Sequence, residues 1–335
     1  MIREACQLAD SEFGVDFSQY DYDKDGFVDF VYVLYSGLGR NDGGSEKTIW
    51  PHASNLSQTI QLDGKTVKRY VCGAEINGIS KTYYGIGLFY HEFGHILGLP
   101  DFYQTGVSNY TFKTLGMWDV MDYGNYNNDA NTPPAYSGYE RFFMGWATPR
   151  VLKDPEDVTL NDLSKTNEVL LITSSRTHNL KGNDPDPNTF YVLENRQKEG
   201  WFEYCQGHGL LLTKVQYDYG TWKGNYVNND SNNQKVDLIE ADGKAPYYDA
   251  AGWFGKEGDT FPSGATEYKG IKDNYLTAIE EENGVITFKF RGGSITTAEE
   301  IEFDQDKEDG KIFYRGQLVI RHNQQLYNAM GQRIQ

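Results

Sequence analysis

The sequence is poor in cysteine, in long apolar runs and in positive charge, and each shortage excludes a class of protein. Its 335 residues contain three cysteines, Cys6, Cys72 and Cys205, which are too few and too scattered for a disulfide framework. One disulfide or three free thiols both remain open. No apolar run approaches the roughly 18 residues that a membrane-spanning helix needs. With 31 basic and 48 acidic residues, the net charge of −17 argues against nucleic acid and anionic membranes as partners.

Aromatic side chains, by contrast, are plentiful. They make up 15% of the chain, which is typical of a folded protein with substantial cores rather than of a disordered chain. The length corresponds to about two domains. The first residues lack the apolar core of a secretory signal peptide, so the chain is either cytoplasmic or a piece of a longer secreted precursor. The motifs described below favour the second interpretation.

The hydrophobic pattern changes near Thr148-Pro149 and divides the chain into an α+β part and a β part. In the first part we expect helices over 1–13, 84–97 and 136–146, a strand over 27–35 and a hairpin closed by Asp63-Gly64. Short alternating segments then predict an all-β domain, most simply a sandwich, in which the Asn-rich stretch 225–233 is an exposed loop. The expected domains are therefore 1–150, 151–293 and a linker with a small β segment, 294–335.

One segment carries a metal-binding motif. It reads His91-Glu92-Phe93-Gly94-His95-Ile96-Leu97-Gly98-Leu99-Pro100-Asp101. Residues four apart on a helix share a face, so His91 and His95 are spaced to bind one zinc ion, with Glu92 beside them as general base. Gly98 allows the helix to end and the chain to turn back, which makes Asp101 the expected third ligand. Three protein ligands and one open position are typical of catalytic zinc.

This motif resembles the elongated zinc motif of the metzincin clan, His-Glu-x-x-His-x-x-Gly-x-x-His/Asp. Its Gly-Leu-Pro-Asp ending and the segment Gly116-Met-Trp-Asp-Val-Met-Asp-Tyr-Gly124 are similar to the immune inhibitor A-type family of secreted bacterial metalloproteases. Further similar segments extend the resemblance over most of the chain; they are Ile49-Trp50-Pro51-His52, Gly145-Trp146, 190–196 and 207–215.

The resemblance implies a metzincin-like catalytic domain, with a mixed sheet and an active-site helix, followed by a β-sandwich. It implies a secreted zinc endopeptidase that cleaves protein or peptide substrates with a zinc-activated water and Glu92 as general base. Met121 would form the Met-containing turn beneath the metal, and Tyr123 would contact the zinc or the developing oxyanion. Family members carry a signal peptide, a pro-segment and further strands upstream, so we expect this chain to lack the first strands of the domain.

The alternative is an inactive module for binding or adhesion that keeps the protease fold and is stabilised by calcium. Calcium is also an expected cofactor of the enzyme itself, because the chain contains an acidic loop. Asp21, Asp23, Asp25, the carbonyl of Phe27 and Asp29 occupy positions 1, 3, 5, 7 and 9 of a calcium loop. Position 12 is not the Glu of an EF-hand, so the site would be of another kind. Without a cation, the four carboxylates would simply cap a turn in water and repel one another.

The C-terminal segment has a weaker signature. Residues Gly316–Ile320 and Tyr327–Gln332 resemble C-terminal sorting segments of secreted Bacteroidetes-type proteins. This resemblance implies an interaction with a secretion machinery and export from the cell. A last β-hairpin of the preceding domain is the alternative.

Overall fold

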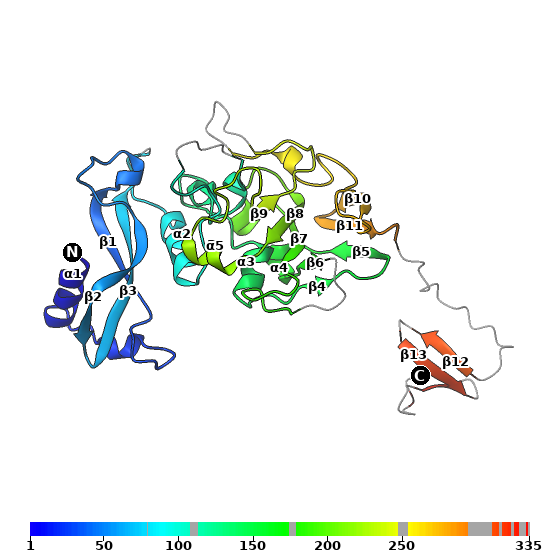
Figure 1. The fold of residues 1–335 in the computed structure, drawn as a ribbon, viewed down its shortest axis with the longest axis horizontal. Helices are drawn as coiled ribbons and strands as arrows, with labels where there is room; N and C mark the ends of the chain where they lie inside the picture. The colour runs from blue at the N-terminus through cyan, green and yellow to red at the C-terminus, as the bar shows by residue number, and fades with distance from the viewer. Residues whose placement is uncertain are drawn as a thin grey trace.

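The described residues form an N-terminal lobe (residues 1–78), a larger central body (residues 80–293) and a small C-terminal sheet (Figure 1). The computed structural model describes residues 1–78, 80–107, 113–173, 179–246, 254–293, 310–314, 317–322, 325–327 and 333. The C-terminal sheet consists of β12 (Gly310–Tyr314), β13 (Gln317–His322) and β14 (Gln325–Tyr327), paired antiparallel in that order. Much of the expected sorting segment lies outside the described residues.

The N-terminal lobe is a helix packed on a three-stranded mixed sheet. Helix α1 (Ile2–Ser11) lies beside a sheet of order β1-β3-β2, in which β1 (Val31–Leu38) runs parallel to β3 (Lys65–Ile76). Strand β2 (His52–Leu62) is antiparallel to β3. The predicted Asp63-Gly64 turn joins them, with φ values of 48° and 75° that suit a two-residue hairpin loop.

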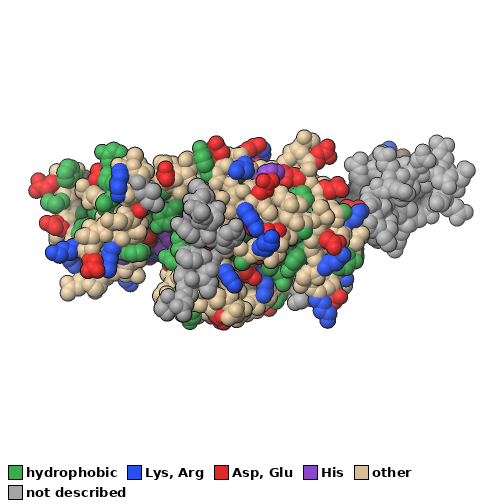
Figure 2. Space-filling view, turned by 90° about the horizontal axis from the view of Figure 1, so that it is seen from above, with side chains coloured by type: hydrophobic (Ala, Val, Ile, Leu, Met, Phe, Trp, Pro, Cys, Tyr) green, Lys and Arg blue, Asp and Glu red, His purple; other side chains and the backbone are tan. Residues whose placement is uncertain are grey.

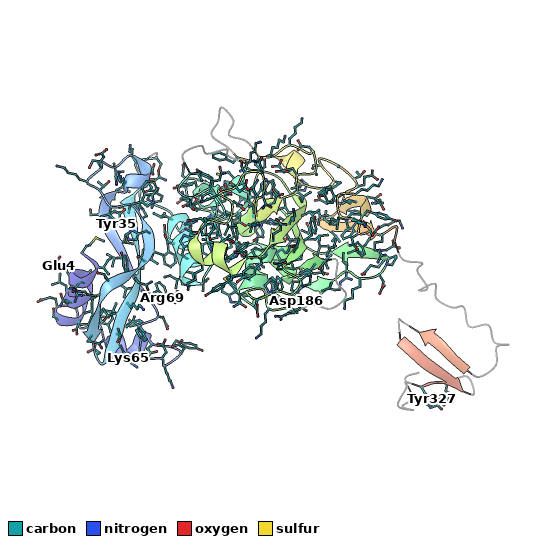
Figure 3. The ribbon with its side chains drawn as sticks, viewed as in Figure 1. Glu4, Tyr35, Lys65, Arg69, Asp186 and Tyr327 are labelled. Atoms are coloured by element: carbon teal, nitrogen blue, oxygen red, sulfur yellow. The ribbon has the colours of Figure 1, made fainter. Side chains whose placement is uncertain are left out.

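Helix α2 (Gly87–Ile96) lies where the N-terminal lobe meets the central body (Figure 1). On the lobe side, Phe89 packs edge-on against Tyr32 of β1, with ring centroids 4.8 Å apart. Arg69 of β3 donates a hydrogen bond to the carbonyl of Ile96 at the helix end, at 2.5 Å (Figure 3). The predicted helix is confirmed, although it begins three residues later than the pattern indicated. Its contacts with the lobe anchor the segment that carries the metal-binding motif.

The centre of the molecule is a five-stranded sheet of order β4-β6-β7-β8-β9. Successive side chains of its strands point to opposite faces of the sheet, and both faces are buried. Phe190 and Val192 belong to one core cluster, whereas Leu193 belongs to another. A second sheet of order β10-β11-β5 covers the second face. The strands are β4 (Arg150–Val151), β5 (Glu156–Leu160), β6 (Leu170–Ile172), β7 (Thr189–Arg196), β8 (Gly209–Gln216), β9 (Val236–Leu238), β10 (Leu276–Glu282) and β11 (Val285–Phe290).

Helices cover the first face of this sheet. Helices α3 (Gly138–Phe143), α4 (Leu163–Thr166) and α5 (Tyr219–Gly224) are short, and Ser137 and Glu140 form a capping box at the start of α3. Single turns of 3-10 helix occur at η1 (Phe17–Tyr20), η2 (Arg40–Asp42), η3 (Gly116–Trp118), η4 (Tyr123–Tyr126), η5 (Gly200–Phe202) and η6 (Glu257–Asp259). The predicted strands of the region 151–293 are present, accompanied by α4 and α5, which the sequence pattern did not predict.

The core between these helices and the sheet draws on both sides of position 150. It contains Phe102, Met121 and Tyr139 from the first part of the chain and Leu211 and Trp222 from the second. The two parts therefore share one hydrophobic cluster.

All three cysteines are buried free thiols. Among the described residues, no helix has the length and apolar composition needed to cross a membrane.

Candidate active site

The metal-binding motif folds as its residue types require. His91 and His95 lie one turn apart on α2, with ring centroids 5.0 Å apart. Gly98 has φ +95°, a left-handed conformation that glycine adopts without strain, and Leu99 donates a backbone hydrogen bond to the carbonyl of Gly94. The chain reverses there, and Asp101 comes back to the face of the helix that carries both histidines.

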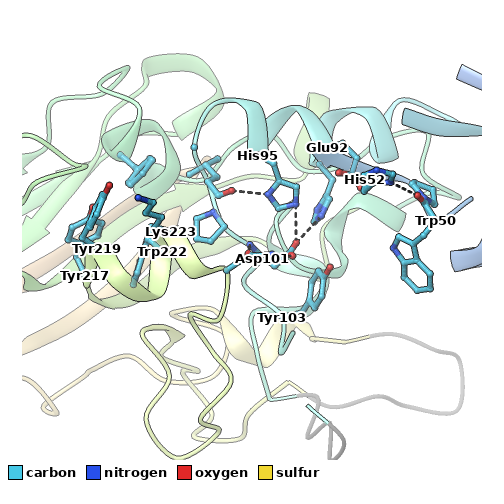
Figure 4. Close-up of a pocket in the computed structure, with 18 residues that line it drawn as sticks. Trp50, His52, Glu92, His95, Asp101, Tyr103, Tyr217, Tyr219, Trp222 and Lys223 are labelled. Carbon is cyan, nitrogen blue, oxygen red and sulfur yellow. Dashed lines mark hydrogen bonds and ion pairs between the residues drawn. The ribbon is translucent and has the colours of Figure 1, made fainter. Parts of the chain in front are cut away.

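Three ligand atoms converge at this point (Figure 4). Oδ1 of Asp101 lies 3.1 Å from Nε2 of His91 and 3.3 Å from Nε2 of His95. All three side chains are largely buried, and their ligand atoms lie within 4.8 Å of one another. Sequence reasoning had named these three residues, and the structure brings them together.

The outer nitrogens of the two imidazoles are held by backbone carbonyls. Nδ1 of His91 lies 2.7 Å from the carbonyl oxygen of Val120, and Nδ1 of His95 lies 2.9 Å from that of Leu99. A carbonyl only accepts, so each Nδ1 carries a hydrogen, and each Nε2, which faces Asp101, is the ring nitrogen left to bind a metal. This second contact is typical of histidines that bind a metal.

The donor set fits a zinc ion. Two imidazole nitrogens and a carboxylate oxygen that has no hydrogen-bond partner face one another in a buried site, and together they could hold one metal ion. In the absence of a metal ion, a proton shared between the histidines and Asp101 would take its place. Burial favours a lower pKa for His91, but the Asp101 carboxylate outweighs it and raises that pKa to about 9. Burial likewise favours a higher pKa for Asp101, yet its close pairing with His91 and His95 holds that pKa well below its usual range.

Met121 lies directly beneath the ligand helix. Its side chain is fully buried, and a Cβ added at Gly94 would collide with its sulfur. The backbone N–H of Met121 donates to Oδ1 of Asp119 at 2.8 Å, which fixes the turn. Gly94, which lies between the two histidines, therefore allows Met121 to approach the helix closely.

An open cleft of about 560 Å³ surrounds the ligand cluster. Glu92 lines it beside the ligands, with 6% of its surface exposed. One wall comes from the N-terminal lobe, at Trp50 and His52, and the opposite wall from the central body, around α5 (Figure 4). That second wall consists of Phe143, Tyr217, Tyr219, Trp222, Lys223 and Asn225. Figure 2 shows histidine side chains in the depression between lobe and body.

Two tyrosines stand beside the cluster, and only one of them lines the cleft. Tyr123, the predicted oxyanion donor, stacks on Phe254 with ring centroids 4.5 Å apart. Tyr103 lies between Tyr123 and the ligands: its ring is 6.1 Å from that of Tyr123 and 6.2 Å from that of His91. Tyr103 lines the cleft, and sequence reasoning missed it. Its position two residues after the third ligand was the only available signal.

The acidic loop also draws its carboxylates together. Oxygens of Asp21, Asp23 and Asp25 lie within 4.8 Å of one another, whereas Asp29 is not part of this group. Nζ of Lys65 lies 2.6 Å from Oδ2 of Asp21 and is the largest of several influences that lower the pKa of Asp21. The amide of Phe27 donates to Oδ1 of Asp25 at 2.8 Å. A lysine thus supplies part of the positive charge that calcium would bring, and calcium binding stays a prediction.

A helix that presents two histidines, a reversed chain that returns a third ligand, and an open cleft between two lobes are the features of a metallopeptidase domain. Comparison with known proteins indicates which family of metallopeptidases the chain resembles. Residues 2–147 match the family model described as immune inhibitor A peptidase M6, catalytic domain. The resemblance to the immune inhibitor A family is therefore confirmed.

Two relatives agree with this match. Immune inhibitor A of Bacillus thuringiensis subsp. alesti is 26% identical over 167 residues, which cover 43% of this chain and 24% of that protein. Pre-pro-metalloprotease PrtV of Vibrio cholerae serotype O1 is 25% identical over 197 residues, 51% of this chain and 21% of that protein. The chain thus spans between a fifth and a quarter of the length of these relatives in the matched region.

Proposed function

We propose that this chain is a zinc-dependent endopeptidase that hydrolyses peptide bonds in protein or peptide substrates. The observation that carries the proposal is the convergence of His91, His95 and Asp101 in an open cleft that Glu92 also lines. The cleft has one wall from the N-terminal lobe and one from the central body, and we expect an extended peptide segment to bind between them. The match to a peptidase family supports the same reaction class.

Different residues of the chain have different roles in the proposed reaction. Zinc, when bound, supplies a Lewis acid and lowers the pKa of a coordinated water toward about 7. Glu92 accepts the proton of the attacking water and returns it to the leaving amine. Burial, followed by the Asp101 carboxylate, raises the pKa of Tyr103, so its phenol stays protonated and can donate to the oxyanion. Tyr123 is the second candidate for this donor, and Met121 supports the ligands from below.

Replacing the proposed general base tests the function. Glu92→Gln keeps the shape of the side chain but cannot accept the proton, so we expect zinc binding to persist while casein cleavage falls by about 10²–10⁴-fold. Glu12→Gln, at an exposed position of the N-terminal lobe, is the matched control and should retain full activity. Undiminished casein cleavage by the Glu92→Gln variant in zinc-replete buffer would rule out the assignment.

The alternative function, an inactive module that binds a partner through the protease fold, makes a different prediction. Such a protein would show no turnover of fluorogenic protein substrates at full zinc occupancy, even as the wild-type chain. We favour the enzyme because Glu92 lines the cleft next to a complete ligand set.

We further propose that the protein acts outside the cell and that calcium binds the acidic loop. The resemblance of its C-terminal residues to sorting segments supports export, and the Vibrio relative is named as a pre-pro form. The grouping of Asp21, Asp23 and Asp25 supports calcium. Detection of the chain in culture medium and a calcium-dependent increase in melting temperature are the corresponding tests.

A further inference from the structure

The Asn-rich segment that follows α5 packs against the segment that carries the third ligand. Oδ1 of Asn225 accepts a hydrogen bond from the backbone N–H of Asp101 at 2.6 Å. Nδ2 of Asn225 donates to Oδ2 of Asp101, also at 2.6 Å. One amide therefore satisfies both the backbone and one carboxylate oxygen of the ligand. The prediction of an exposed loop is wrong here, since Asn228 is fully buried.

This pairing determines which oxygen faces the histidines. With Oδ2 held by Asn225, Oδ1 is left without a hydrogen-bond partner and points at Nε2 of His91 and of His95. A carboxylate free to rotate would present either oxygen and would lose part of its binding free energy to side-chain entropy.

Two more asparagines hold the same segment. Nδ2 of Asn228 donates to the carbonyl of Phe102 at 2.8 Å. Asn229 pairs with both backbone groups of Thr105, accepting from its N–H at 2.7 Å and donating to its carbonyl at 2.6 Å. We call Asn225, Asn228 and Asn229 the asparagine clamp.

The clamp is itself anchored to the central sheet. Oδ1 of Asn228 accepts hydrogen bonds from the backbone of Lys235 and of Val236, the first residue of β9, at 2.9 and 3.0 Å. Asn225 ends α5 in the left-handed conformation, with φ 57°, which asparagine tolerates better than most residues. The clamp therefore links the segment around Asp101 to the central sheet by hydrogen bonds.

We propose that Asn225 is a positioning residue for the metal site: it orients the carboxylate of Asp101, and through it the region after residue 150 sets the metal affinity of the histidine motif. This inference rests on the proposed zinc site. Asn225 lies 124 residues from its partner in sequence and outside the stretch 2–147 that matches the catalytic-domain model. The metal centre is thus completed by a part of the chain that the family match does not cover.

Two substitutions at position 225 separate orientation from folding. Asn225→Asp is isosteric and can still accept from the Asp101 N–H, but it places a second carboxylate against Oδ2. Asn225→Gly suits the left-handed backbone and removes the side chain. Asn229→Ala weakens the clamp without touching Asp101, and Asn232→Ala changes an exposed asparagine of the same loop. All four are made in the full chain.

The readouts are zinc affinity, by competition with a chromogenic chelator, and the absorption spectrum of the Co²⁺-substituted protein. We expect Asn225→Asp and Asn225→Gly to bind zinc about 10–100-fold more weakly and to show an altered cobalt spectrum. Asn229→Ala should lower the melting temperature with a smaller loss of affinity, and Asn232→Ala should match the wild type. Circular dichroism of the apo forms verifies that each variant folds.

The outcomes distinguish this inference from the proposed function. Wild-type affinity and an unchanged cobalt spectrum in both Asn225 variants would overturn the positioning role while leaving the zinc site intact. An equal loss of affinity in Asn229→Ala and Asn225→Gly would also overturn it, since general loosening of the loop would then explain the effect. Failure of the wild-type chain to bind zinc would instead overturn the proposed function itself.

Discussion

Gly94 of the ligand helix and Met121 of the turn beneath it are in contact, and a single methyl group added at Gly94 would overlap with the methionine sulfur. Gly94 lies between His91 and His95 in the chain, so this contact limits how closely the helix that carries both histidines can approach Met121. A glycine in a helix interior normally costs about 0.5–1 kcal/mol relative to alanine. The close approach of Met121 explains why a glycine, and not an alanine, occupies position 94 of the helix.

Gly94→Ala should therefore destabilise the protein despite the better helix propensity of alanine. We expect a loss of about 1–3 kcal/mol in the free energy of unfolding, because the buried methionine has little space into which to move. Urea unfolding monitored by circular dichroism measures this loss. Gly258→Ala is the control, since the atoms nearest to a Cβ there belong to Asp242 and lie at 3.4 Å or more. Equal stability of the two variants would contradict the tight contact.

The convergence of His91, His95 and Asp101 could be predicted from sequence because its geometry is local. His91 and His95 share a helix face by periodicity alone, and Gly98 marks the reversal that returns Asp101. The strands of the central sheet were equally visible, since alternation of apolar residues is a property of each strand by itself. Both kinds of signal lie within a dozen residues of the feature they predict.

The remainder of the site depends on contacts that no local pattern encodes. Asn225 looks like any loop asparagine, and only the packing of α5 against the ligand segment gives it a partner 124 residues away. The distance in sequence from the metal-binding motif does not tell whether Tyr103 or Tyr123 is the better candidate for the oxyanion donor. The stacking of Tyr123 on Phe254 arises from tertiary structure. The hydrophobic core that combines residues before and after position 150 could not be predicted for the same reason.

Asp122 makes stability depend on pH. Burial raises its pKa to about 7, well above the 3.8 of an exposed aspartate, and its Oδ2 accepts from the N–H of Gly116 at 2.9 Å. Because the folded state holds this proton more tightly than the unfolded state does, the stabilisation is fully present below pH 3.8 and is lost as the pH rises through 7.

Asp122→Asn should remove this dependence, since a neutral amide cannot titrate. We expect the difference in unfolding free energy between wild type and variant to change by about 3 kcal/mol between pH 4 and pH 8, in favour of the variant at pH 8. Both proteins are measured in EDTA, so that titration of the metal ligands cancels. A difference that stays constant with pH would show that Asp122 does not carry the proton.

Lys65 competes with any cation at the acidic loop. Its ammonium group lies 2.6 Å from Asp21, where it occupies part of the space and charge that calcium would need. Lys65→Met removes the charge, so we expect tighter calcium binding and a larger calcium-dependent rise in melting temperature after EDTA treatment than in the wild type. Lys68→Met, at an exposed position of the same strand, should behave as the wild type. Absence of any calcium effect in all three proteins would reject the calcium site.

Residues 1–150 alone should fail to form the metal site. The core beneath the ligands contains Leu211 and Trp222 beside Phe102 and Met121, so removing the second part exposes apolar side chains on the face that supports Asp101. The asparagine clamp is lost at the same time. We expect this fragment to unfold without a cooperative transition and to bind zinc at least 10-fold more weakly than residues 1–293, since ligand support alone accounts for about 10–100-fold. Calorimetry and chelator competition measure both properties. A cooperative fragment with the zinc affinity of 1–293 would establish position 150 as a true domain boundary and would show that the histidine motif needs nothing beyond it.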